Sequence, residues 1–307
     1  MKKIVIISGP TAVGKTNISI KLAKAVNGEI ISADSVQVYR GMNIGSDKIK
    51  PEQMQGVEHY LIDSLEPDED FDVSVFQRMA VSAIDIICEK GKIPIIVGGT
   101  AFYIQALLYG IDFNGEDHDV SFRNEASLLD EDTLYNKLLE IDPAYALTVH
   151  KNNKKRVIRA LEYNHYTGRL FSDYNFEQAQ KKAVYDFKYF VLNDDRQKLY
   201  EKIERRVQEM FKEGLVDEVS SLLDKGYGSD LVSMQGIGYK EICTYLRGEC
   251  TLSEAEEEIK RNTRHFAKRQ LTWLRHENDT IFINKPDYHY DEDKIVEAMI
   301  KEIGDIQ

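Results

Sequence analysis

A glycine-rich stretch near the amino end decides the fold. It reads Gly9-Pro10-Thr11-Ala12-Val13-Gly14-Lys15-Thr16 and directly follows the apolar run KIVIIS at residues 3–8. The stretch has the pattern G-x-x-x-x-G-K-[ST] at every fixed position, and it lies between a predicted strand and a predicted helix, as this phosphate-binding motif requires. The sequence therefore predicts a phosphate-binding loop that joins the first strand of a parallel sheet to the helix after it.

The chemistry of this loop follows from its residue types. Backbone N–H groups and the positive end of the following helix point toward anionic oxygens. Lys15 adds a full positive charge, and the Thr16 hydroxyl is a ligand for Mg²⁺. We expect all eight residues, Gly9 to Thr16, to bind phosphate groups, with Thr16 as the metal-binding residue and Mg²⁺ as the cofactor.

The rest of the chain is consistent with an α/β fold. Buried-type strands are predicted at 4–8, 29–33, 93–97 and 187–192, and a helix at 15–26. Strands that alternate with helices indicate a parallel sheet. The chain after residue 192 is predicted to be mostly helical, with a long helical pattern at 199–223 that Gly214 bends or divides. The expected fold is a P-loop NTPase-like parallel sheet flanked by helices.

A segment in the middle of the chain has a different character. Residues 113–186 carry many charges and few strand signals, and they include helical patterns at 133–141 and 156–166. We predict a mostly helical insertion domain at 113–186, within an α/β core formed by residues 1–112 and 187–307.

Charge is distributed unevenly along the chain. The net charge of −12 over 307 residues, taken alone, argues against a nucleic-acid partner. However, residues 151–182 contain eight Lys or Arg against three acids, and residues 260–276 contain six Lys or Arg and no acid. The acids are concentrated elsewhere, at 58–72 and 112–132. Two locally basic segments therefore remain candidates for contact with a polyanion.

The second basic segment has helical periodicity. At about 100° per residue, four cations fall within an arc of roughly 60°, and we call them the basic stripe: Arg261, Arg264, Lys268 and Arg275. The opposite side is expected to be buried and carries Ile259, Phe266, Trp273 and Leu274. Two interpretations stay open: an ordinary solvated face, or a surface that grips a polyanion.

Other features restrict the class of protein. The three cysteines, Cys88, Cys243 and Cys250, form no metal-binding or disulfide pattern, which favours a reduced, cytoplasmic protein. The first residues fit a strand better than a signal peptide. The longest uncharged run, 93–111, is interrupted by Pro94, Gly98 and Gly99, so a strand, turn and helix are expected there and no membrane contact.

Asp34 is a candidate site residue because of its position. A nucleotide-hydrolysing enzyme would normally place an Asp at the end of a further strand to hold Mg²⁺. The strand at 93–97 ends in Gly98-Gly99-Thr100 instead, and the only predicted strand that runs into an Asp is 30–34. Asp34 is therefore a metal-linked carboxylate, a general base near the phosphates, or a turn cap.

Several separated stretches of the sequence carry information together. They are GPTAVGKT (9–16), ADSVQVYRGMNIGS (33–46), HYLID (59–63), IPIIVGGTAFYIQALL (93–108), KRVIRALE (155–162), IERRVQEMFKEGLVDEV (203–219), MQGIGYKE (234–241) and RHFAKRQLTWLR (264–275). In this combination they resemble the tRNA dimethylallyltransferase family, also called tRNA isopentenyltransferases. The resemblance extends nearly from end to end in one order.

The resemblance implies a reaction. Such an enzyme transfers the prenyl group of dimethylallyl diphosphate to N6 of the adenosine on the 3′ side of the tRNA anticodon, and it releases diphosphate. By the same resemblance Asp34 accepts the proton of the amine, while Thr100 and Arg206 help the loop to stabilise the leaving group. Arg205 is the neighbouring residue, but the family alignment points to Arg206.

The resemblance also implies a tRNA surface. The adenosine must leave its stack to reach a buried carboxylate, so the residues after Asp34 are placed to read it. The expected tRNA-binding residues are Asp34, Ser35, Val36, Gln37, Thr100, Arg123, Lys155, Arg156, Val157, Ile158, Arg159, Met234, Gln235, Gly236, Ile237, Gly238 and Tyr239. The expected partners are the tRNA anticodon stem-loop and dimethylallyl diphosphate, and a monomer is expected.

Two rival functions share the loop and the sheet. A nucleotide or small-molecule kinase would need ATP turnover and no prenyl donor. A transferase that prenylates free adenine nucleotides would not need the basic segments. A non-enzymatic RNA-binding module is disfavoured, because it would have no use for a complete phosphate loop.

Overall fold

The chain divides into two compact units. In the computed structural model, which describes residues 1–113 and 121–304, unit 1 comprises residues 1–107 and 185–307, and unit 2 comprises residues 108–184. The insertion was expected at 113–186, so the compact unit starts and ends a few residues earlier. Residues 114–120 of the expected insertion and residues 305–307 of the expected core lie outside the described part of the chain.

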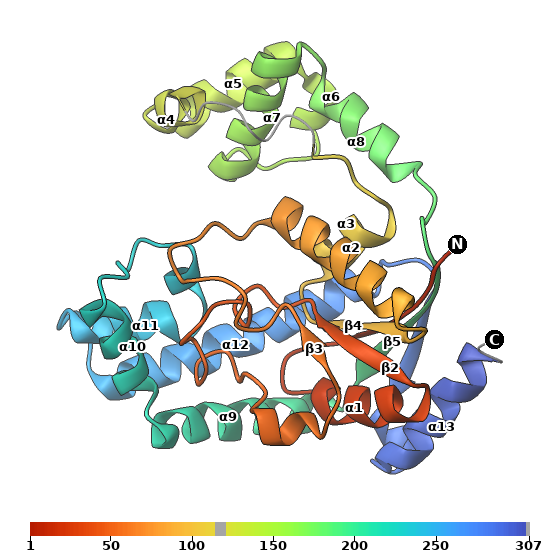
Figure 1. The fold of residues 1–307 in the computed structure, drawn as a ribbon. Helices are drawn as coiled ribbons and strands as arrows, with labels where there is room; N and C mark the ends of the chain where they lie inside the picture. Colours follow the sequence, from red (N-terminus) through yellow and green to blue (C-terminus); the bar gives the residue numbers. More distant parts are fainter. Residues whose placement is uncertain (114–120, 305–307) are drawn as a thin grey trace. The chain divides into compact units, whose positions relative to one another are not determined.

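Unit 1 is built on a six-stranded parallel sheet. Its strand order is β3-β2-β4-β1-β5-β6, with β1 inside the sheet and neighbours on both sides. Figure 1 shows the strands between α1 and α13 on one side and α2 on the other. The strands are β1 (Lys3–Ser8), β2 (Gly28–Ser32), β3 (His59–Tyr60), β4 (Ile93–Gly98), β5 (Asp186–Asn193) and β6 (Thr280–Asn284).

The sequence explains why these strands are parallel and central. β1 and β4 are nearly continuous apolar runs, and the residues from Ile4 to Ile7 are almost fully buried. Such runs are typical of strands that are covered on both faces by helices. The helices of unit 1 are α1 (Lys15–Ala25), α2 (Val73–Glu89), α3 (Ala101–Leu108), α9 (Arg196–Glu213), α10 (Leu215–Asp224), α11 (Tyr239–Leu246), α12 (Leu252–Leu274) and α13 (Glu292–Ile303), with 3₁₀ turns at Pro51–Met54, Ser233–Gln235 and Lys285–Tyr288.

Two strands were not predicted. β3 is only two residues long, and β6 follows a long charged helix in a region that was expected to be helical. Each pairs in parallel with a strand that is distant in the sequence, β3 with β2 and β6 with β5. Short edge strands carry little periodicity of their own, so their existence depends on a partner that a local pattern does not contain.

The division of the long helical pattern after residue 192 is confirmed. α9 ends at Glu213 and α10 begins at Leu215, and Gly214 between them has φ 100°. This left-handed conformation favours glycine, which lacks the Cβ that would be strained there. Gly214 therefore ends one helix and starts the next at a new angle, which brings α10 against residues 41–45.

The predicted buried face of α12 is partly wrong. Ile259 and Leu274 are buried as expected, whereas Trp273 is 38% exposed and Phe266 is half-buried. The buried positions follow the spacing Ile259, Thr263, Ala267, Gln270 and Leu274. Trp273 instead donates from Nε1 to Glu277 and packs edge-on against Phe102, contacts that a helical projection alone does not contain.

Unit 2 is helical. Its own core gathers small and aliphatic side chains such as Leu134, Leu138, Val157 and Leu161. The backbone N–H of Val184 donates to the carbonyl of Leu108 at 2.9 Å, so the two ends of this unit lie side by side. Its helices are α4 (Ser121–Ser127), α5 (Glu131–Ile141), α6 (Pro143–Ala146), α7 (Lys154–Thr167) and α8 (Phe171–Ala179).

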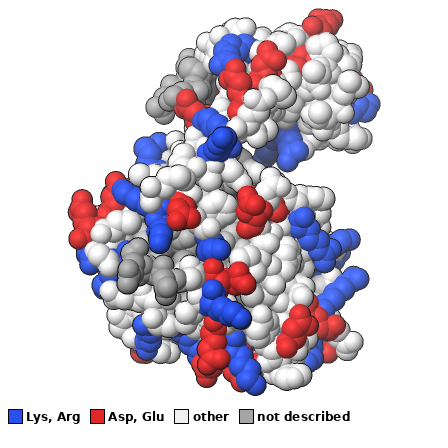
Figure 2. All heavy atoms as spheres, turned by 90° about the vertical axis from the view of Figure 1, so that its right-hand side faces the viewer, with Lys and Arg blue, Asp and Glu red and all other residues white. Residues whose placement is uncertain are grey.

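Within residues 1–113 and 121–304, no helix has both the length and the apolar character needed to cross a membrane. The three cysteines are free thiols. On the face drawn in Figure 2, Lys and Arg side chains are interspersed with Asp and Glu side chains.

Candidate functional site

The phosphate loop lies at the carboxyl end of β1. Gly9 has φ 147°, and a Cβ there would lie 2.5 Å from the carbonyl oxygen of Leu192 in β5, so only glycine fits. Gly14 begins α1 with φ 92° and offers no side chain to cap the helix. No side chain at Gly14 therefore accepts hydrogen bonds from the first N–H groups of α1. Uncapped N–H groups at the start of a helix attract anions.

Side chains from distant elements hold the loop in shape. Lys15 donates from Nζ to the carbonyls of Gly9 and Pro10, at 3.0 and 2.9 Å. Lys285, buried after β6, donates to the carbonyl of Val13 at 3.1 Å. Gln270 in α12 accepts from the Thr11 N–H at 2.9 Å and donates to the Gly99 carbonyl at 2.9 Å. Loop carbonyls are thus bound by lysines behind the loop.

Burial changes the acidity of the loop lysine. The pKa of Lys15 is lowered from 10.5 to about 8, chiefly by desolvation and to a smaller extent by the charge of Arg206, while the charges of Asp34 and Asp47 act in the opposite direction. These four side chains therefore share one electrostatic environment. An arriving anion would favour the protonated form of Lys15.

Asp34 lies two residues after the end of β2 and forms a turn. Its Oδ1 accepts hydrogen bonds from the backbone N–H groups of Val36 and Gln37, at 2.9 and 3.2 Å. The turn-cap interpretation is therefore right as geometry, and it does not exclude a chemical role for the half-buried carboxylate. β2 and β1 belong to one parallel sheet, so their carboxyl ends lie at the same edge, and the charge of Asp34 raises the pKa of Lys15 in the phosphate loop.

Thr100 lies on the neighbouring strand end. Its N–H donates to the carbonyl of Ala33, and its own carbonyl accepts from Tyr103 at the start of α3. The approach of β2 and β4 is very close, because a Cβ on Gly98 would lie 2.2 Å from the Ala33 carbonyl oxygen. Thr100 and Asp34 are therefore brought to the same edge of the sheet.

Arg206 reaches the loop from α9. Its Nη1 donates to the Thr11 hydroxyl at 2.8 Å and pairs with the carboxylate of Asp47 at 3.2 Å. The neighbouring Arg205 is exposed. Of the two arginines, Arg206 is thus the one that contacts the phosphate loop.

The residues after Asp34 differ in accessibility. Ser35 is exposed, and Val36 and Gln37 are half-buried. The Gln37 side chain accepts from the Ser32 hydroxyl and donates to the carbonyls of Ser46 and Asp47, at 3.2 and 3.3 Å. These bonds fix which end of the amide is the donor.

The stretch from Met234 to Tyr239 is only partly available. The side chains of Met234 and Tyr239 are 0% exposed, and Gly238 is buried. In this structure the RNA contact expected of those three residues is therefore not available at the surface. The residues of this stretch that remain accessible for RNA contact are Gln235, which is exposed, and Gly236 and Ile237, which are half-buried.

The candidates in unit 2 lie on α4 and α7. Lys155 and Arg156 are exposed, whereas Val157 and Ile158 are buried in the unit's own core. The side chains of Val157 and Ile158 are therefore packed inside unit 2 and are not exposed for contact with RNA in this structure. Arg123 forms two hydrogen bonds with the buried carboxylate of Glu162, at 3.1 and 2.7 Å, and Arg159 pairs with the same carboxylate at 3.5 Å.

One expectation about strand ends is corrected. β5 extends to Asn193 and is followed directly by Asp194, so Asp34 is not the only Asp that follows a strand. Asp194 is fully buried on its side chain, pairs with Lys202 at 2.5 Å and accepts from the Tyr290 hydroxyl at 3.1 Å. Its carboxylate is thereby used in structural contacts, which leaves Asp34 as the candidate base.

The basic stripe of α12 is partly neutralised within unit 1. Arg264 pairs with Glu204 at 2.9 Å, and Arg261 pairs with Glu258. Lys268 and Arg275 are exposed. The solvated-face interpretation thus fits the first two positions, and Lys268 and Arg275 remain candidates for contact with a polyanion.

The loop has the chemistry of a magnesium site that is completed by substrate. Thr16 is exposed at the start of α1, and hydroxyl, carboxylate and phosphate oxygens are the ligands that Mg²⁺ prefers. Among the described residues, no cluster of three or more His, Cys, Asp or Glu side chains could hold a metal ion. The residues present therefore fit a cation that arrives with phosphate groups.

Four site residues were missed at the level of sequence: Asp47, Glu218, Gln270 and Lys285. Gln270 carried a weak signal, because it is a polar residue that falls on the buried face of α12. The other three carried none, since each contacts its partner only through the fold.

Comparison with known proteins is consistent across sequence and structure. A family profile described as "IPP transferase" matches residues 37–277. A tRNA dimethylallyltransferase of Lachnoclostridium phytofermentans is 53% identical over 305 residues, which cover 98% of this chain and 97% of the relative. One from Bacillus pumilus is 46% identical over 296 residues, 95% and 92% of the two chains.

Two solved structures are also similar. The full-length tRNA isopentenylpyrophosphate transferase of Bacillus halodurans has a TM-score of 0.75 and 41% identity, and the match covers 99% of this chain and 97% of that one. A eukaryotic dimethylallyltransferase acting on tRNA has a TM-score of 0.82 and 29% identity, over 92% and 74% of the two chains.

Proposed function

Since the chain belongs to the IPP transferase family, we propose that its phosphate loop holds the diphosphate of dimethylallyl diphosphate, while Asp34 accepts a proton from the attacking amine. The chain is a transferase that moves a dimethylallyl group onto tRNA. The finer proposal is that the acceptor is N6 of the adenosine on the 3′ side of the anticodon. The single observation that carries it is the position of the Asp34 carboxylate, just after β2, at the same edge of the parallel sheet as the phosphate loop that follows β1.

The reaction needs a base because the adenine amine is a poor nucleophile. Its lone pair is delocalised into the ring, and bond formation leaves a positive charge on N6. In the proposed step the N6–C1 bond forms, the C1–O bond breaks with its electron pair going to diphosphate, and Asp34 takes the N6 proton. Thr100, on the adjacent strand end, lines the same edge.

The leaving group accumulates negative charge, and donors at the phosphate loop would stabilise it. The loop amides, Lys15 and Arg206 all lie at the loop, and Arg206 is directed there by its bonds to Thr11 and Asp47. Groups aimed at developing charge stabilise the transition state more than the ground state. Thr16 would hold Mg²⁺, which when bound neutralises part of the diphosphate charge.

Recognition of the RNA is proposed for the surfaces that remain exposed. Ser35 would contact the extruded base, and Gln37 would accept a hydrogen bond from the adenine edge through its amide oxygen, because its amide nitrogen already donates to the carbonyls of Ser46 and Asp47. Gln235, Lys155, Arg156 and the exposed cations of α12 would contact the anticodon stem-loop. The expected RNA role of Arg123 and Arg159 stays a proposal, as do a monomeric enzyme and a cytoplasmic location.

A labelling experiment tests the function against its rivals. The protein is incubated with dimethylallyl diphosphate labelled in the prenyl group and with an anticodon stem-loop RNA, AMP or ATP. We expect label in the RNA alone. Label in AMP or ATP would instead support a free-nucleotide prenyltransferase, and ATP turnover without a prenyl donor would support a kinase.

The acceptor position is tested with matched RNAs. The adenosine on the 3′ side of the anticodon is replaced by N6-methyladenosine, inosine or guanosine, while the rest of the stem-loop is unchanged. Inosine and guanosine lack the N6 amine, so transfer should be lost in both. Label in either of those RNAs would contradict N6 of that adenosine as the acceptor.

A further inference from the structure

A short segment connects the two halves of the site. Residues 43–48, which we call the coupling segment, follow the predicted base-reading residues and lie against α10. The far part of the segment, Ser46 and Asp47, contacts both Gln37 and Arg206. The position of this segment therefore bears on both substrates.

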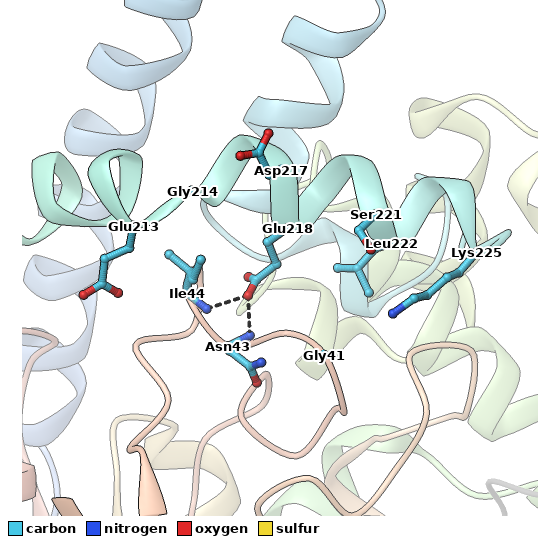
Figure 3. Close-up of a pocket in the computed structure, with 10 residues that line it drawn as sticks. All are labelled: Gly41, Asn43, Ile44, Glu213, Gly214, Asp217, Glu218, Ser221, Leu222 and Lys225. Carbon is cyan, nitrogen blue, oxygen red and sulfur yellow. Dashed lines mark hydrogen bonds between the residues drawn. The ribbon is translucent and has the colours of Figure 1, made fainter. Parts of the chain in front are cut away.

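One carboxylate holds the beginning of the segment. Glu218 of α10 accepts hydrogen bonds from three successive backbone N–H groups, from Asn43 at 2.9 Å, Ile44 at 2.8 Å and Gly45 at 3.1 Å. Figure 3 shows Glu218 directed from α10 toward Asn43 and Ile44, while the adjacent Asp217 points away from them. Hydrogen bonds to an ionised carboxylate are about twice as strong as those between neutral groups.

A buried tyrosine completes the contact. The Tyr239 hydroxyl donates to Glu218 at 2.8 Å, and the side chain is 0% exposed. Burial raises the pKa of Tyr239 well above its ordinary value, so the hydroxyl keeps the proton that it donates. A Cβ on Gly45 would lie 2.5 Å from the Tyr239 ring, so the segment can pass here only as glycine.

The far part of the segment holds the site residues. The carbonyls of Ser46 and Asp47 accept from Gln37, at 3.2 and 3.3 Å. The Asp47 side chain pairs with Arg206 at 3.2 Å, and Arg206 donates to the Thr11 hydroxyl at 2.8 Å. A continuous chain of contacts thus runs from Glu218 to the adenine side and to the diphosphate side.

We propose that Glu218 is a positioning residue, which sets Gln37 for the adenine and Arg206 for the diphosphate by holding the coupling segment. This inference rests on the proposed function, because it assumes that Gln37 and Arg206 meet the two substrates. Glu218 itself touches neither. Glu218 acts through the backbone N–H groups of Asn43, Ile44 and Gly45, which its two carboxylate oxygens hold in position.

The test uses the full-length protein and a substitution of matched size. Glu218→Gln keeps the shape of the side chain but removes its charge. It also replaces one of the two acceptor oxygens with an NH2 group, a donor that would face the backbone N–H groups of the segment. Asp217→Asn is the control. It removes the same charge from the preceding residue of the same helix, and the Asp217 side chain is exposed. We measure kcat, the KM of each substrate, the Kd for stem-loop RNA and the melting temperature.

We expect Glu218→Gln to lower kcat by about 10-fold to 100-fold, the loss that a misplacement of about 1 Å produces. The melting temperature of Glu218→Gln should fall, because charge-assisted hydrogen bonds are lost, but the variant should be folded at the assay temperature and its Kd for RNA should stay near that of the wild type. Asp217→Asn should behave as the wild type. Tyr239→Phe removes one donor and keeps the ring, so it should lower kcat in the same direction by less. It provides the test should Glu218→Gln not fold.

A double-mutant cycle with Gln37→Ala separates positioning from a general structural role. If Glu218 acts through Gln37, its loss should cost much less in the Gln37→Ala background than alone, whereas independent effects add. Additive losses, or a Glu218→Gln enzyme with wild-type kcat, would overturn the inference while leaving the function intact. A wild-type enzyme that labels no RNA would overturn both.

Discussion

Asp34 is the residue at which a turn-forming role and a chemical role can be separated. Its Oδ1 accepts from two backbone N–H groups, an arrangement that an asparagine oxygen also provides. An asparagine cannot take a proton from the adenine amine. The two roles therefore respond differently to a single substitution.

We predict that Asp34→Asn leaves the turn and RNA binding intact and lowers kcat by about 100-fold to 10,000-fold, the range that general base catalysis supplies. The measurement is single-turnover transfer of label, together with the Kd for the RNA. Asp217→Asn, which removes a carboxylate from an exposed position outside the site, is the comparison. An Asp34→Asn enzyme with normal transfer would remove Asp34 as the base.

Lys15 gives the site a pH dependence. Its pKa of about 8 in the free enzyme means that the side chain loses its charge as the pH rises through 8. Affinity for dimethylallyl diphosphate should be full below that pH and should fall above it, by at most about tenfold per pH unit for a single linked proton. The KM for the donor, measured between pH 6.5 and 9.5, checks this.

The same linkage predicts proton uptake near pH 8, because bound diphosphate favours the charged form of Lys15. Calorimetry in buffers of different ionisation enthalpy measures that uptake. Lys15→Met should bind the donor weakly and with a flat profile through pH 8. A profile that keeps its slope in this variant would assign the titration to another group.

At the scale of elements, the buried side and the exposed side of α12 have different functions. Its buried side places Gln270 between the phosphate loop and the end of β4, and a Cβ on Gly99 would lie 2.1 Å from the Gln270 amide nitrogen. Its outer side carries the basic stripe, of which Lys268 and Arg275 are exposed. The inner side fixes the helix, and the outer side is the part that we propose contacts an RNA backbone.

The outer side is tested by salt dependence. We predict that Lys268→Gln combined with Arg275→Gln weakens RNA binding and makes the slope of log K against log salt concentration shallower by about 1 for each lost phosphate contact. Lys294→Gln with Lys301→Gln, on exposed positions of α13, removes the same charge elsewhere. Equal slopes in the two pairs would mean that the stripe is only a solvated face.

At the scale of the whole molecule, unit 2 is inserted between α3 and β5 of unit 1. Its ends adjoin, since Val184 donates to Leu108 at 2.9 Å, and it has a core of its own. The residues that form the phosphate loop and its supports all belong to unit 1. Unit 1 should therefore bind phosphate groups without unit 2.

We predict that replacing residues 109–183 by a short Gly-Ser linker leaves unit 1 folded and able to bind dimethylallyl diphosphate. RNA binding should weaken by at least about tenfold, because the exposed cations of α7 are lost. Circular dichroism, thermal melting and donor binding test the first part, and RNA titration tests the second. Loss of donor binding in a folded variant would show that the units depend on each other.

The sequence by itself determined the phosphate loop, the inner strands and the helical character of the insertion. The reason is local: left-handed glycines, buried apolar runs and helical spacing leave their pattern in a few adjacent residues. Gly9 and Gly14 in the loop and Gly214 between helices are examples, and their φ values are all positive. The family motifs then pointed to Asp34, Thr100 and Arg206, whose positions the structure describes at one edge of the sheet.

Only the tertiary structure decided which side chains support that edge. Gln270 is 259 residues from Thr11, and Glu218 is 175 residues from Asn43, so no local pattern could connect them. The same holds for β6, which exists because β5 offers it a partner, and for Trp273, whose exposure follows from its neighbours. A side chain acquires such a role from the groups that the fold brings to it, and these are defined only when the sheet has assembled.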